Sequence, residues 1–131
     1  MGTLGIGGNI LKWEEADLNL SKELIAEYKE MRPIIQEGQF YRLENTSQNA
    51  YHCFEYVKEE EALLFVFLPQ TQIGHRGIRI RLRGLEENKS YQFIYEGNTY
   101  VKSGAYLMHH GLDIRLVGDY ASEVIRFVAV K

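Results

Sequence analysis

The chain has 131 residues, of which 45% are hydrophobic and 25% charged, as expected for a globular protein with one sizeable core. Its formal net charge of -3 argues against general nucleic-acid binding, which needs a basic excess. No run reaches the ~18 apolar residues that a membrane-spanning helix needs. A single cysteine, Cys53, excludes an internal disulfide and gives no sign of an oxidising compartment. We therefore expect a cytoplasmic protein with no nucleic-acid and no membrane partner.

A glycine-rich start is followed by a helical pattern. Apolar residues recur at three- and four-residue steps from Leu20 through Leu24 to Met31, which predicts an amphipathic helix over residues 14–31. Acidic residues at its start suit the helix dipole. Pro33 is expected to end the helix, because proline disfavours helical backbone at the residue before it.

Beyond residue 33 the pattern changes from helical to alternating, which predicts a domain boundary there. Short segments separated by turn signals are predicted as strands: 40–44, 50–58, 62–68, 78–83, 90–95, 99–101, 106–108, 114–117 and 124–130. An acidic turn is expected at residues 59–61 and a tight hairpin at Gly97-Asn98. The predicted fold is mainly β: an antiparallel β-sandwich of Greek-key type over residues 34–131, preceded by one long N-terminal α-helix within residues 1–33.

Apolar and basic residues alternate strictly over residues 78–83. In a strand this period places Ile80 and its apolar neighbours on one face and Arg81 and its basic neighbours on the other. We expect the surrounding sheet to be buried on one face and solvated on the other. The arginines are expected to form a solvated face, with an acidic partner surface as the alternative.

Groups that could carry chemistry are few. The chain has four histidines, His52, His75, His109 and His110. None of them has metal-ligand spacing to a cysteine or a carboxylate. We therefore expect no metal and no cofactor. Asp119 lies in a predicted turn, where hydrogen bonding to the local backbone is favoured over a role as general base. Cys53 has the setting of a buried strand residue rather than a reactive thiol. Strand tyrosines leave open a sugar-stacking platform.

Several ordered motifs resemble bacterial α-galactosidases of glycoside hydrolase family 36. Residues 4–9 (LGIGGN), Trp13 and residues 25–33 (IAEYKEMRP) are similar to the end of that family's catalytic barrel. The motifs that resemble its C-terminal domain, in the same order, are residues 41–43 (YRL), 82–85 (LRGL) and 118–122 (GDYAS).

The resemblance implies that residues 1–33 end a (β/α)8 barrel and that a β-sandwich follows. The family hydrolyses terminal α-galactosides with retention, using two carboxylates that lie upstream of the matched region, so no catalytic residue is assigned. Gly7, Gly8 and Asn9 match the end of the last barrel strand, where barrel sites lie, and are the candidates for lining the sugar pocket of the parent enzyme.

The sequence thus predicts a non-catalytic C-terminal domain that supports an upstream catalytic barrel and acts on α-galactosides only through it. A carbohydrate-binding module that uses surface aromatics is the alternative. A complete small enzyme is disfavoured because no reaction centre is recognisable. The helix should leave an apolar stripe without its barrel partners, and we expect self-association to cover it. The stripe consists of Leu18, Leu24, Ile25, Tyr28 and Met31.

Overall fold

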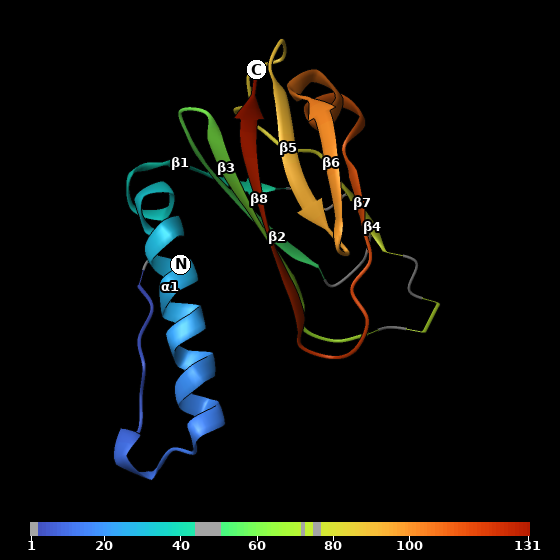
Figure 1. The fold of residues 1–131 in the computed structure, drawn as a ribbon. Coiled ribbons are helices and arrows are strands. Elements are labelled where there is room, and N and C mark those ends of the chain that lie inside the picture. Colours follow the sequence, from blue (N-terminus) through green and yellow to red (C-terminus); the bar gives the residue numbers. More distant parts are fainter. Residues whose placement is uncertain (1–2, 44–50, 72, 75–76) are drawn as a thin grey trace.

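The computed structural model describes residues 3–43, 51–71, 73–74 and 77–131. One long helix leads into antiparallel strands that form a six-stranded and a two-stranded sheet (Figure 1). The predicted mainly β architecture with an N-terminal helix is therefore confirmed. Residues 45–49 (NTSQN), whose polar composition predicts a loop, lie outside the described residues, as do His75 and Arg76.

Helix α1 spans Glu15–Glu37, so the prediction that Pro33 ends it is wrong. The missing N–H of proline costs about 3 kcal/mol inside a helix. Directly after it, Ile34 and Ile35 are buried at 1% and 9% exposure, and each contributes about 1.5–3 kcal/mol. Packing of the last turn against the sheet therefore outweighs the proline. The helix also crosses the expected boundary after residue 33.

The six-stranded sheet has the order β1-β2-β3-β8-β5-β6, and every described pair in it is antiparallel. The last strand of the chain thus lies at its centre, between β3 and β5 (Figure 1). The strands are β1 (Gln39–Leu43), β2 (His52–Lys58), β3 (Glu61–Leu68), β5 (Ser90–Tyr95), β6 (Asn98–Ser103) and β8 (Ala121–Val130).

The second sheet pairs β4 (Ile78–Ile80) with β7 (Leu112–Ile114). Its apolar side chains join the inner face of the six-stranded sheet in one core. The alternation over 78–83 is confirmed, because Ile80 and Leu82 are buried while Arg79 and Arg81 are exposed. The strand itself ends at Ile80, since the next apolar residue already hydrogen bonds to Leu107 outside any ladder.

Strand β3 is buried on both faces, unlike the sheet with one solvated face that the sequence predicted. Leu64 and Val66 point into the main core, whereas Leu63 and Phe65 pack under α1. The helix supplies a second cover, which is why the strand is an almost continuous apolar run.

Two local predictions also fail. Residues 106–108 belong to a π-helix, Tyr106–His110, rather than a strand. The strand expected at 114–117 is instead Leu112–Ile114. A hairpin between β5 and β6 is confirmed, but its turn lies one residue earlier than the predicted Gly97-Asn98. Its two turn residues are Glu96 and Gly97, which both have positive φ, 49° and 75°, as a type I′ turn requires.

Candidate functional site

The candidate pocket residues lie in the extended segment before a short 3-10 helix, Ile10–Lys12. Gly7, Gly8 and Asn9 are all exposed. The Asn9 side chain accepts a hydrogen bond from the N–H of Leu11 at 3.2 Å, and Gly8 adopts φ 119° beside the Trp13 indole. Their geometry is that of a capped turn at the surface, and their role in a sugar pocket stays a prediction.

The apolar stripe of α1 is covered where the helix packs on the sheet and is exposed in the earlier part of the helix. Tyr28 and Met31 pack against the cluster beneath the last helical turns. Leu24 is 49% exposed, as is Leu20 at 56% on the same helical face, although Leu20 was not part of the predicted stripe. The other two predicted members, Leu18 and Ile25, are half-buried. Figure 1 shows this earlier part of α1 extending away from the strands.

The segment that precedes the helix exposes further apolar side chains. Leu4, Ile6, Ile10 and Leu11 are 42%, 43%, 54% and 96% exposed. We call these residues, together with Leu20 and Leu24, the apolar N-terminal surface. They lie on the N-terminal segment, the 3-10 helix and the first half of α1, and exposed apolar groups that gather in one region mark an interaction surface.

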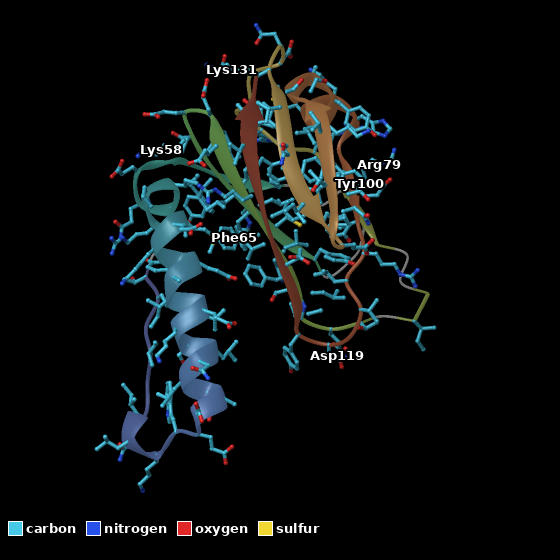
Figure 2. The ribbon with its side chains drawn as sticks, viewed as in Figure 1. Lys58, Phe65, Arg79, Tyr100, Asp119 and Lys131 are labelled. Carbon is cyan, nitrogen blue, oxygen red and sulfur yellow. The ribbon has the colours of Figure 1, made fainter. Side chains whose placement is uncertain are left out.

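Ion pairs hold α1 at its place on the sheet. Arg126 of β8 binds Glu61 of β3 at 2.6 Å and Glu30 of α1 at 3.3 Å. Lys58, labelled near the end of the helix in Figure 2, pairs with Glu37. Phe65 lies on the side of β3 that faces α1 (Figure 2). The last helical turns are thus fixed by both apolar and charged contacts.

A buried carboxyl group, missed in the sequence, lies under the inner face of the sheet. Glu55 is fully buried, and its Oε2 accepts a hydrogen bond from the N–H of Arg83 at 2.7 Å. Its Oε1 has no partner among the described residues. Burial raises its pKa to about 8. The sequence did indicate this burial: in the alternating pattern of β2, Glu55 lies on the same side as Cys53 and Val57, which both belong to the core.

The other candidate groups are separated in space. Asp119 Oδ1 accepts from the Thr71 N–H at 2.8 Å, so it joins two loops instead of closing the local turn that was predicted. His109 pairs with Glu87 at 2.9 Å. Cys53 is buried as predicted, and burial raises its pKa to about 11. Over the described ranges, no cluster of three His, Cys, Asp or Glu could hold a metal.

The arginine stretch forms a partly paired outer surface. Arg79 makes a bidentate ion pair with Asp113, at 2.8 and 3.0 Å. The pKa of that aspartate is lowered by this hydrogen bond. Arg81 and Arg83 are exposed, which confirms that the basic side of the alternation faces outward. Whether this face meets an acidic partner stays open to experiment.

Among the described residues, the most exposed aromatic rings lie on different elements. Phe40 is on β1 and Tyr120 is in the turn before β8. Tyr100 of β6 stacks on Phe93. The ring of Tyr106 contacts two neighbouring side chains: Lys102 lies 4.9 Å over its centre, and the His110 ring is 4.6 Å away.

These features define an all-β accessory domain with a helix whose outer part lacks a cover. Residues 51–127 match the glycosyl hydrolase family 36 C-terminal domain, and the chain belongs to that family. No helix in the part of the chain that the structure describes is long and apolar enough to cross a membrane.

Individual related proteins are similar to this chain over its N-terminal helix as well. The chain is 31% identical to alpha-galactosidase 1 of Pediococcus pentosaceus over 98% of its own length but only 18% of that protein. Among solved structures it is similar to the GH36 alpha-galactosidase AgaA of Geobacillus stearothermophilus, with a TM-score of 0.80 and 29% identity. That match covers 92% of this chain and 17% of the other.

Proposed function

We propose that this chain is the C-terminal part of an α-galactosidase in which residues 1–33 end the catalytic (β/α)8 barrel and residues 34–131 form a supporting β-sandwich. The upstream barrel carries the hydrolysis of terminal α-galactosides. The sandwich is non-catalytic, and its role is to cover the side of the barrel.

The apolar N-terminal surface is the observation that carries this proposal. Leu20 and Leu24 continue the face of α1 that is buried further along, at Ile35. A helix face that is exposed to solvent in the complete protein normally carries polar residues at such positions. The similar proteins contain more than four-fifths of their length outside the match, which supports a preceding body as the missing cover.

A chimera tests the proposal. The region of the Pediococcus pentosaceus enzyme that aligns with this chain is replaced by this chain, and hydrolysis of a nitrophenyl α-galactoside is measured. We expect activity in the chimera and none in the enzyme truncated at the same point. The isolated chain should show no turnover. An inactive but folded chimera, or reproducible turnover by the isolated chain, would refute the proposal.

Two helix variants sharpen this test. Leu24→Glu places a charge on the exposed apolar face and should lower the thermal-inactivation midpoint of the chimera. Ala26→Glu adds the same charge on the other side of the helix, at an exposed position, and should leave the midpoint unchanged. Equal effects of the two substitutions would mean that the apolar face has no partner.

A further inference from the structure

The outer face of the six-stranded sheet is covered by α1 only in part. The last helical turns seal Tyr56, Leu63 and Phe65, which are 6%, 0% and 4% exposed. Beyond this cover, Phe40 on β1 is 45% exposed and Val124 on β8 is 40% exposed. Apolar side chains therefore continue across the sheet past the end of the helix contact.

Three phenylalanines, which we call the phenylalanine row, run diagonally from the cluster into this open part: Phe67 and Phe54, which are half-buried, and Phe40, which is exposed. Strand register places them on the same face, because Phe40 is opposite Tyr56 and Phe54 is opposite Phe65. The Phe40 and Phe54 rings stack at 5.9 Å, and Phe54 and Phe67 lie 6.3 Å apart. A strand face intended for water would have tyrosine or polar residues here, since phenylalanine offers no polar end.

The row is continuous with the helix face. Phe54 and Phe67 pack against the same buried cluster as Tyr28 and Met31 of α1. The apolar surface therefore runs from Leu24 down the helix, over the cluster and onto the sheet. This surface has two sides, which we call its walls: one is the apolar face of α1 and the other is the phenylalanine row. The two walls meet at the cluster.

The charged groups where α1 meets the sheet form ion pairs with one another. Arg126 of β8, which lies opposite Leu63 of the cluster on the same face, is bound by Glu61 and Glu30. A partner that approaches this corner meets paired charges, whose burial costs less than that of single ones.

We propose that the phenylalanine row is the second wall of the interface with the upstream barrel, and this inference rests on the proposed function. A body seated on Leu20 and Leu24 lies beside the row, because both belong to one continuous surface. The occupant is the preceding part of the same polypeptide, whose apolar surface would fill the angle between α1 and the sheet. A second copy of the chain is the outcome that would overturn this choice.

The test uses the chimera described above together with the isolated chain. Phe40→Lys and Phe67→Lys each place a charge in the row. Val117→Lys is the control, because Val117 is 81% exposed in the loop between β7 and β8, outside the sheet face that carries the row. We expect the row variants to lower the thermal-inactivation midpoint of the chimera by several degrees more than they lower the thermal-unfolding midpoint of the isolated chain. The control should change neither.

Three results would overturn the inference while leaving the proposed function intact, provided that the unmodified chimera is active. The row variants could leave the chimera unchanged. They could destabilise the isolated chain as much as the chimera, which would make the row part of the sandwich alone. They could also convert an oligomeric chimera to monomer in sedimentation without changing the stability of the monomer, which would assign the row to a second copy. An inactive, folded unmodified chimera would overturn both proposals.

Discussion

The carboxylate oxygen of Glu55 lies 2.7 Å from the backbone nitrogen of Arg83, and this hydrogen bond holds the segment after β4 against the sheet. The fully buried acid sits on β2, opposite Tyr41 of β1 and Leu64 of β3. Burial penalises its charged form more than the Arg83 N–H and guanidinium favour it. The group is therefore mostly a neutral acid at neutral pH.

This relationship predicts a dependence of stability on pH. The pKa is about 8 in the folded chain, above the ordinary 4.5 of an unfolded one. The unfolded state therefore loses its proton first, and the free energy of unfolding should fall between pH 4.5 and 8 and level off above that range. Urea unfolding at pH 5, 7 and 9 measures the slope. Glu55→Gln should flatten it, whereas the exposed Glu27→Gln should keep it. A wild-type profile without this fall would contradict the buried neutral acid.

The two faces of residues 78–83 should respond differently to truncation. Ile80 is 3% exposed, and Ile80→Ala should cost about 2–5 kcal/mol through lost burial and a cavity. Arg81 is exposed, and Arg81→Ala should stay within about 0.5 kcal/mol. Chemical denaturation of both variants gives the comparison. The reverse order would show that the alternation does not govern burial.

Gly84 is required by a close contact as well as by its backbone. Its φ is 69°, and an added Cβ would lie 2.6 Å from the Tyr41 hydroxyl. Gly97 has φ 75° with nothing within 4 Å. Gly97→Ala should therefore cost about 1–2 kcal/mol, for the left-handed backbone alone, and Gly84→Ala should cost more. Replacing Tyr41 by Leu in the Gly84→Ala background should recover part of the difference. Equal costs at both glycines would exclude the steric contribution.

The isolated chain should self-associate through the apolar N-terminal surface. Burying Leu20 and Leu24 between copies removes exposed apolar area from water. We expect sedimentation to show oligomers that shift toward monomer in the Leu20→Glu, Leu24→Glu double variant, while Ala26→Glu leaves them intact. Circular dichroism should show that the strands remain folded in all three. A wild-type chain that is monomeric at high concentration would contradict this prediction.

Much of the architecture follows from local patterns in the sequence. Alternation predicted the inward positions of Ile78, Ile80 and Leu82 correctly, because side chains in extended backbone point to alternate sides whatever surrounds them. A tight hairpin was predicted at Gly97-Asn98 for a similarly local reason, namely that glycine adopts positive φ without strain, and the turn forms one residue earlier, at Glu96-Gly97. The existence of α1 followed from its periodicity.

Other features depend on tertiary contacts and do not follow from local sequence patterns. The helix continues past Pro33 because Ile34 and Ile35 find a cluster on β2 and β3, segments more than 15 residues further along the chain. The sequence contains both isoleucines but does not say which surface they meet. Likewise Glu55 becomes a buried acid only because the segment at Arg83 folds over it and excludes water. Such effects depend on contacts between distant residues, and these form only when the whole sheet is assembled.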